Sequence, residues 1–228
     1  MRSVLETDGY KLSMAEAGWP LRRETFYFGH RQGGPAVMPV DVAAFVRSLL
    51  PTATDADYAF LAEHGYLLGG GFRGAIGKAA EVHVDAVPQG AIFYPGEPAF
   101  SVTGPSALVS WLEPLVLQLH FRIQLASLLR FQLEKLPELV GEATCEAERE
   151  LIREELERAK VSAPAPRIDA GYRARVRDVA ASLVAAVGDG SRIFEVGMRS
   201  ASCEDQHLLA LEGCKEAGVT RTSNVFGA

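Results

Sequence analysis

The sequence of 228 residues has only three cysteines, Cys145, Cys203 and Cys214, an odd number at irregular spacing. This pattern fits neither a disulfide framework nor a zinc site, so it predicts a protein of the reducing cytoplasm. No uncharged apolar run is long enough to span a bilayer, and the residues after Met1 form no apolar signal region. The formal net charge is −6, which argues against a general binder of nucleic acid or membrane surfaces.

One glycine-rich segment contains G-x-G-x-x-G, the spacing of dinucleotide-binding loops, at Gly69, Gly71 and Gly74. Such a loop needs a strand before it and a helix after it. The residues that follow, 80–87, alternate apolar and polar side chains as a strand does. We therefore exclude a dinucleotide site and expect a flexible turn at 69–77.

The composition, 48% hydrophobic and 23% charged, is typical of a globular protein with one large or two small domains. Periodicity, cap residues and turn residues predict a mixture of helices and strands. The expected elements are a helix at 8–17 capped by Thr7 or Asp8, a strand at 25–30, helices at 40–50 and 55–65, a meander of strands at 81–102, a helix at 105–136 interrupted at Pro114, and a helix at 170–187 with Val176, Val179, Leu183 and Val187 inward. Residues 137–166 are rich in charge and proline and predict a surface insertion of unknown role.

The last forty residues show the clearest organisation. An apolar run at 193–196 predicts a strand, residues 203–217 an amphipathic helix that ends at Gly218, and residues 219–224 a second strand. This order is one βαβ unit. Because α/β folds bind ligands at the carboxyl ends of their strands, Arg199 and Thr222-Ser223-Asn224 become candidate site residues.

Four stretches of the sequence resemble one family, the nicotinate and nicotinamide phosphoribosyltransferases. F-E-V-G-M-R-S-A followed by T-S-N-V resembles the family's E-F/L-G-x-R and G-T-S-N-V elements, and T-D-G-Y-K-L-S-M resembles its opening. A further stretch matches its proline and glycine pattern at Pro88, Gly90, Phe93, Pro95, Glu97, Pro98, Val102, Gly104 and Pro105. The fourth matches at Leu112, Glu113, Phe121, Ala126, Ser127 and Arg130.

The resemblance implies an α/β fold: an α+β open sheet layer in a domain at 1–130, a helical connector at 131–190, and the first units of a TIM-like barrel at 191–228. It also implies that the barrel is truncated and that the chain is the N-terminal half of the enzyme, which would leave Ile193, Val196 and Val225 in a sheet without a neighbour. The implied reaction joins nicotinate to phosphoribosyl pyrophosphate to give nicotinate mononucleotide in NAD biosynthesis. Mg²⁺ and ATP are the implied cofactors.

The resemblance also implies roles for individual residues. Tyr10 would stack on the pyridine ring, and Arg199 would bind its carboxylate, with the two residues supplied by different subunits of a homodimer. Thr222, Ser223 and Asn224 would bind phosphate oxygens, and Ser127 and Arg130 would lie near the phosphoribosyl group. Each of these residues also has an interpretation without a binding role. Tyr10 would then be a core residue, Ser127 an ordinary residue of a helix, and Arg130 a solvent-exposed arginine.

Three departures from the family leave alternatives open. Ser200 stands where many nicotinate enzymes have a second arginine, so nicotinamide or another pyridine acid remains possible as the substrate. His120 replaces an asparagine of the family. The phosphorylated histidine of the family lies in a G-T-x-A-H-S element that does not occur in these residues; His207 is not given its role, and the catalytic residue is unknown. A non-catalytic half that assembles with another chain is the alternative function.

Overall fold

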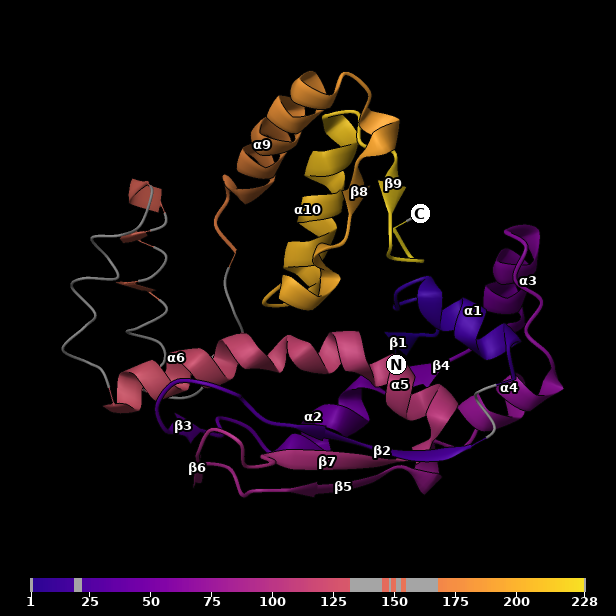
Figure 1. The fold of residues 1–228 in the computed structure, drawn as a ribbon, viewed down its shortest axis with the longest axis vertical. Helices are drawn as coiled ribbons and strands as arrows, with labels where there is room; N and C mark the ends of the chain where they lie inside the picture. The colour runs from indigo at the N-terminus through magenta and orange to yellow at the C-terminus, as the bar shows by residue number, and fades with distance from the viewer. Residues whose placement is uncertain are drawn as a thin grey trace.

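The computed structural model describes residues 2–18, 22–131, 145–147, 149–150, 153–154 and 168–227. It has a mixed α/β fold in which a layer of small sheets and helices lies against a second unit that carries the last strands (Figure 1). The first part contains β1 (Arg2–Ser3), α1 (Tyr10–Glu16), β2 (Arg23–Phe28), β3 (Ala36–Val37), α2 (Val42–Leu49), β4 (Pro51–Thr52), α3 (Asp55–Glu63), α4 (Gly70–Ile76), η2 (Ala79–Glu81), β5 (His83–Ala86), β6 (Ile92–Phe93), β7 (Phe100–Pro105), α5 (Ser106–Leu117) and α6 (Leu119–Phe131). The second contains α9 (Tyr172–Val187), η4 (Gly190–Arg192), β8 (Phe194–Glu195), η5 (Gly197–Ser200), α10 (Glu204–Glu216) and β9 (Arg221–Thr222).

The described helices include none that is both long and apolar enough to cross a membrane. The domain boundaries proposed from the sequence stay predictions, and most of the charged insertion at 137–166 lies outside the described residues.

The largest sheet has three antiparallel strands in the order β2–β7–β5. Its central strand β7 pairs Phe100 with Phe28 of β2 on one side and with Ala86 of β5 on the other. The expectation of a meander over 81–102 is wrong in its pairing, because β6 leaves this sheet and pairs with β3. Turns on both sides of β6 permit the departure, since Gly90 and Gly96 adopt left-handed φ values of 83° and 84°.

Helices α5 and α6 replace the single helix expected over 105–136, and they extend along the sheet layer (Figure 1). The interruption falls at Gln118 rather than at Pro114. Proline removes one backbone hydrogen bond from a helix, and α5 continues past Pro114 because it is buried on almost every side. The helix ends where Gln118 N–H bonds to Leu115 O at 3.2 Å, a tight three-residue turn.

The flexible turn expected at 69–77 is also wrong, since this segment forms helix α4. Phe72 and Ile76, one helical turn apart, are buried together with Trp111 in the apolar cluster beneath α1. Burial of these side chains outweighs the low helix propensity of the glycines. The exclusion of a dinucleotide loop stands, because the residues directly before α4, at 64–69, form no strand.

The predicted βαβ unit is confirmed: β8 and β9 are parallel, pairing Glu195 with Thr222, and α10 connects them. At the amino ends of β8 and β9, the backbone of Gly190 lies close to the backbone of Gly218. A Cβ added to Gly190 would clash with the Gly218 carbonyl. A barrel is not confirmed, because β8 and β9 form a sheet of two strands.

Helix α9 packs on α10 at Gly213, where an added Cβ would lie 2.7 Å from the carbonyl oxygen of Arg173. The prediction that Val179, Leu183 and Val187 point inward is wrong, since all three are exposed. Helix α9 instead buries Ala180. The missing side chain of Gly213 therefore allows the close approach of the two helix backbones.

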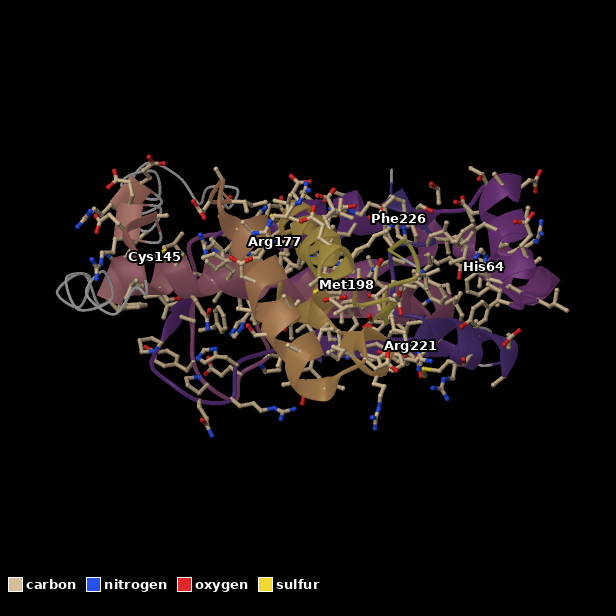
Figure 2. The ribbon with its side chains drawn as sticks, turned by 90° about the horizontal axis from the view of Figure 1, so that it is seen from above. His64, Cys145, Arg177, Met198, Arg221 and Phe226 are labelled. Atoms are coloured by element: carbon tan, nitrogen blue, oxygen red, sulfur yellow. The ribbon has the colours of Figure 1, made fainter. Side chains whose placement is uncertain are left out.

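The prediction that apolar side chains of the last sheet lack a covering neighbour holds for Val196 and fails for Val225. Val196 is 66% exposed, whereas Val225 is 8% exposed and packs in the cluster beneath α1. Met198 is buried in the cluster between the main sheet, α2 and α5. Figure 2 places Met198 near the middle of the molecule, between Cys145 toward one end and His64 toward the other. Met198 thus anchors the turn after β8 to the first part of the chain.

Candidate active site

The N-terminal segment 7–10 lies directly against the C-terminal segment 222–225. Gly9 N–H donates to Ser223 O at 2.7 Å, and Val225 N–H donates to Thr7 O at 3.0 Å. The Ser223 hydroxyl donates to Asp8 Oδ1 at 2.9 Å. The expected helix cap by Thr7 or Asp8 is wrong, because Gly9 is the N-cap of α1 and no side chain caps it. Asp8 is used instead to join the two ends of the chain.

A buried carboxylate, Glu195, connects the carboxyl ends of β8 and β9. Its Oε2 accepts from Thr222 Oγ1 at 2.8 Å, and its Oε1 accepts from Gly197 N–H at 2.5 Å. His207 Nε2 on α10 lies 3.2 Å from Oε2. Burial alone would raise the pKa of Glu195, but its hydrogen bonds to His207, Thr222 and Gly197 hold that pKa below its usual range.

Thr222 also hydrogen-bonds to the loop that follows β9. The Asn224 N–H donates to Thr222 Oγ1 at 3.1 Å, and Asn224 Nδ2 lies 3.1 Å from Met198 Sδ. Gly227 N–H in turn donates to Asn224 Oδ1 at 2.8 Å. The predicted phosphate-binding residues thus form one hydrogen-bonded loop fixed to β8.

Arg199 follows β8 and meets α1 and α5 in an ionic cluster. Its Nη2 donates to Glu113 Oε2 at 2.9 Å and to the Tyr10 hydroxyl, and it lies 3.4 Å from Asp8 Oδ2. The guanidinium carbon lies 5.2 Å from the centroid of the Tyr10 ring. Lys11 completes the cluster, with Nζ 3.2 Å from Glu113 Oε2 and 3.0 Å from Ser110 Oγ.

The ionic cluster shifts the protonation of its members. Partial burial, followed by the charge of Glu113, raises the pKa of Tyr10 to about 12. Burial lowers the pKa of Lys11, against the opposing attraction of Glu113. Burial would lower the pKa of Arg199 as well, but the neighbouring Glu113 and Tyr10 raise it. At neutral pH the cluster therefore presents a neutral tyrosine beside a permanently charged guanidinium.

The sharing of the site between two subunits stays a prediction, but Tyr10 and Arg199 already meet within a single chain. The expectation rested on the idea that one subunit does not bring the N-terminal layer to the ends of the last strands. The pairing of segment 7–10 with segment 222–225 does bring them together, because it carries α1 to the end of β8. Tyr10 and Arg199 therefore meet within one chain.

Ser127 and Arg130 lie on α6, which extends away from α1 (Figure 1). The Ser127 hydroxyl donates to Ile123 O at 2.5 Å and accepts from Val37 N–H at 2.9 Å, so it attaches β3 to α6. Arg130 is exposed in the last turn of α6. The structure therefore does not bring these two residues to the cluster of Tyr10 and Arg199.

The sequence alone assigns no binding role to Lys11, Glu113 and Glu195, although Lys11 follows Tyr10 directly and the two glutamates lie in the family motifs. Lys11 has a side chain only 5% exposed, and buried lysines are rare unless paired. Glu195 interrupts the apolar run of a strand, and a carboxylate in such a run is a signal of a required hydrogen-bond acceptor. Among the described residues, no group of three or more His, Cys, Asp or Glu side chains could hold a metal ion.

An open groove of about 770 Å³ runs along β8, β9 and α10. Glu195 and Thr222 line its polar part, and Phe194, Leu208, Leu211 and Phe226 line its apolar part. Thr222, the first of the predicted phosphate-binding residues, therefore borders space large enough for a small molecule.

No protein-family model matches the sequence, and no curated protein matches it. Solved structures do match. A protein of Saccharomyces cerevisiae assigned as a nicotinate phosphoribosyltransferase aligns with 100% of this chain and 51% of its own, at 14% identity and a TM-score of 0.52. The nicotinate phosphoribosyltransferase of Porphyromonas gingivalis aligns with 100% of this chain and 51% of its own, at 18% identity and a TM-score of 0.50. The alignment with human nicotinic acid phosphoribosyltransferase covers 95% of this chain and 59% of the human chain, at 17% identity and a TM-score of 0.43.

The chain thus spans about half the length of the structures it matches. The fold is similar to that of phosphoribosyltransferase structures. More particularly, it is similar to about half of the fold of two nicotinate phosphoribosyltransferases, so the resemblance predicted from the sequence is confirmed at the level of fold.

Proposed function

We propose that the chain binds nicotinate at Tyr10 and Arg199 and takes part in its phosphoribosylation. The observation that carries the proposal is the contact of the Arg199 guanidinium with the face and hydroxyl of Tyr10, at the end of a parallel strand. An aromatic face suits a pyridine ring, and a guanidinium suits its carboxylate. The fold, shared with nicotinate phosphoribosyltransferases, supports the same assignment.

The second substrate is phosphoribosyl pyrophosphate, whose phosphate we assign to the loop of Thr222, Ser223 and Asn224. In the reaction, the pyridine nitrogen forms a bond to the anomeric carbon while the bond from that carbon to a pyrophosphate oxygen breaks. Pyrophosphate leaves with the bonding electron pair. Positioning of the two reactants supplies most of the catalysis in such a transfer, and Glu195 serves it by holding the loop and the Arg199 turn together.

Mg²⁺ and ATP belong to this proposal through the family resemblance alone. The described residues offer no cluster of metal ligands, and the histidine element associated with ATP does not occur in the sequence. The described residues therefore do not fit Mg²⁺ or ATP, and no step of the reaction is assigned to Mg²⁺ or ATP. A cytoplasmic location is part of the proposal because all three cysteines are free thiols.

Two alternatives each have an observation in their favour. Ser200, in the place of the family's second arginine, favours nicotinamide or another pyridine acid as the ligand. The exposed apolar side chains of Phe194 and Val196 at the two-stranded sheet of β8 and β9 favour a non-catalytic module that assembles with another chain, including a second copy of itself.

The test is equilibrium binding of nicotinate, nicotinamide and phosphoribosyl pyrophosphate to the purified 228-residue chain by calorimetry, followed by an assay for nicotinate mononucleotide. Arg199→Ala should weaken nicotinate binding about tenfold or more, the loss expected for a charged hydrogen bond. Tyr10→Ala should weaken it through the loss of ring stacking. Arg31→Ala, in an exposed loop, is the matched control and should leave binding unchanged.

Three outcomes separate the alternatives. Nicotinate binding with product formation supports the enzyme, and nicotinate binding without product supports a substrate-binding half. Stronger binding of nicotinamide than of nicotinate supports the alternative substrate. Binding of nicotinate that is equal in wild type, Arg199→Ala and Tyr10→Ala would reject the site.

A further inference from the structure

The carboxylate of Glu113 occupies the centre of the ionic cluster. A single oxygen, Oε2, lies within hydrogen-bond distance of three donors: Tyr10 Oη at 3.2 Å, Lys11 Nζ at 3.2 Å and Arg199 Nη2 at 2.9 Å. No other carboxylate of the described chain contacts all three of these side chains. Glu113 therefore has the partners that an anionic ligand at this site would need.

The guanidinium of Arg199 is engaged through one nitrogen only. Its contacts with Glu113, Tyr10 and Asp8 all use Nη2, and among the described residues neither Nε nor Nη1 has a partner. A guanidinium can bind a carboxylate through two donors either along its Nη1–Nη2 edge or along its Nε–Nη2 edge. Both edges contain Nη2, so a ligand that binds Arg199 through two donors has to displace one of its present partners.

Glu113 is the partner best able to leave. Asp8 is buried and accepts a hydrogen bond from Ser223, and Tyr10, the first residue of α1, supplies the ring on which the ligand is proposed to stack. The side chain of Glu113 is 30% exposed, so its carboxylate already borders solvent. It also borders a small apolar cavity of about 90 Å³ between α5 and β2.

The balance of charge determines what can replace Glu113. Asp8 and Glu113 offset the charges of Lys11 and Arg199. Lys11 is nearly buried, and an unpaired buried charge is costly, so removal of Glu113 requires another anion in its place. A carboxylate supplies that charge and an amide does not.

We propose that Glu113 is an internal substitute for the ligand carboxylate, which the carboxylate of an aromatic acid displaces from Arg199 and Lys11 on binding. Glu113 thereby tunes the affinity of the site for anionic ligands, because only an anion replaces the charge that its displacement removes from Lys11 and Arg199. This inference rests on the proposed function for the identity of the ligand as nicotinate.

The test measures binding of nicotinate, nicotinamide and benzoate to the 228-residue chain by calorimetry. Benzoate has the carboxylate and the ring but lacks the pyridine nitrogen. In Glu113→Gln the competing charge is gone, so both carboxylates should bind about tenfold more tightly, whereas nicotinamide binding should change little. Arg199→Lys combined with Glu113→Gln should abolish the gain, because lysine has no two-donor edge.

The control is Glu63→Gln, which changes the net charge equally at an exposed position of α3. It should leave all three affinities unchanged. Should Glu113→Gln fail to fold, Glu113→Asp keeps the charge but has a shorter reach, and it should also tighten carboxylate binding.

Nicotinate and benzoate affinities that are unchanged or weaker in Glu113→Gln would overturn the displacement while leaving the proposed site in place. A tighter affinity for benzoate, without nicotinate binding in any variant, would uphold the displacement and reject the proposed function. Absence of binding of either carboxylate to wild type and Glu113→Gln would reject both.

Discussion

Thr222 Oγ1 donates a hydrogen bond of 2.8 Å to Glu195 Oε2, and this contact joins the carboxyl ends of the two parallel strands β8 and β9. Glu195 also accepts from Gly197 N–H, at the start of the turn that carries Arg199. One carboxylate thus sets the distance between the two parts of the candidate site. Its charge state should affect stability and ligand binding together.

Glu195→Gln should reduce the free energy of unfolding at pH 7 by about 1–3 kcal/mol, the range for loss of hydrogen bonds to a charged group. The folded-state pKa of Glu195 lies below its usual value, so the stabilisation is present above the unfolded pKa of about 4.3 and is lost as pH falls through the folded value. The difference between variant and wild type should therefore narrow below about pH 4. Urea unfolding at several pH values measures it, with Glu63→Gln as control, and a difference independent of pH would contradict the charged role.

The hydroxyl of Tyr10 should titrate late, near pH 12. Burial and the charge of Glu113 raise its pKa, so Glu113→Gln should lower that pKa. Burial also raises the pKa of Tyr58 and of Tyr172, so Tyr10→Phe should remove one late transition and leave theirs. Because the folded pKa is raised, any stability linked to Tyr10 is present below about pH 10 and is lost as the pH rises toward the folded value. Tyrosinate absorbance follows the titration, with circular dichroism to show that the chain stays folded. A Tyr10 transition at the ordinary value would show that the contact with Glu113 is not formed in solution.

Two glycine-to-alanine substitutions in helices should have opposite effects. Gly213→Ala places a methyl group 2.7 Å from the Arg173 carbonyl oxygen of α9, so it should separate the helices and lower the melting temperature. Gly74 in α4 has no atom within 4 Å of an added Cβ, so Gly74→Ala should stabilise the chain by about 0.5–1 kcal/mol through helix propensity. Thermal unfolding of both variants provides the measurement. Equal effects in the two would mean that α9 and α10 are not in close contact.

The placement of Tyr10 and Arg199 in one chain predicts the result of mixing two variants. A mixture of Tyr10→Ala and Arg199→Ala should bind nicotinate no better than the separate variants do, because neither chain has a complete pair. Binding of nicotinate to the mixture is compared with binding to each variant alone, after subunit exchange has been established with labelled chains. Recovery of binding in the mixture would support a site shared between subunits.

Several parts of the fold were predictable because their signals are local. The βαβ unit followed from one apolar run, one amphipathic helix and Gly218, and the helix predicted at 40–50 forms as α2, where Asp41 accepts a hydrogen bond from the N–H of Ala44. The family motifs likewise placed Arg199 and Thr222 at strand ends. Local spacing is sufficient for such features because the interacting residues lie within a few positions of one another.

The errors concern interactions between distant residues. The helix at Gly70–Ile76 depends on burial of Phe72 beside Trp111, and no property of the glycine-rich segment itself indicates this partner. The contact of Tyr10 with Arg199 depends on Asp8 pairing with Asn224, more than two hundred positions later. The three exposed apolar residues of α9 show the converse, because a periodic pattern predicts a helix but not which of its faces becomes covered.

The close approach of Gly190 to Gly218 lies at the amino ends of β8 and β9, whereas Glu195 and Thr222 link their carboxyl ends. Changes at the two glycines should therefore alter the thermal tolerance of the unit without altering which molecules it recognises. A search for altered specificity can be confined to the turn after β8, the loop after β9 and Glu113 of α5. A search for a thermally more stable variant can begin at the amino ends of β8 and β9. Substitutions there can be selected by melting temperature alone, without a ligand-binding assay.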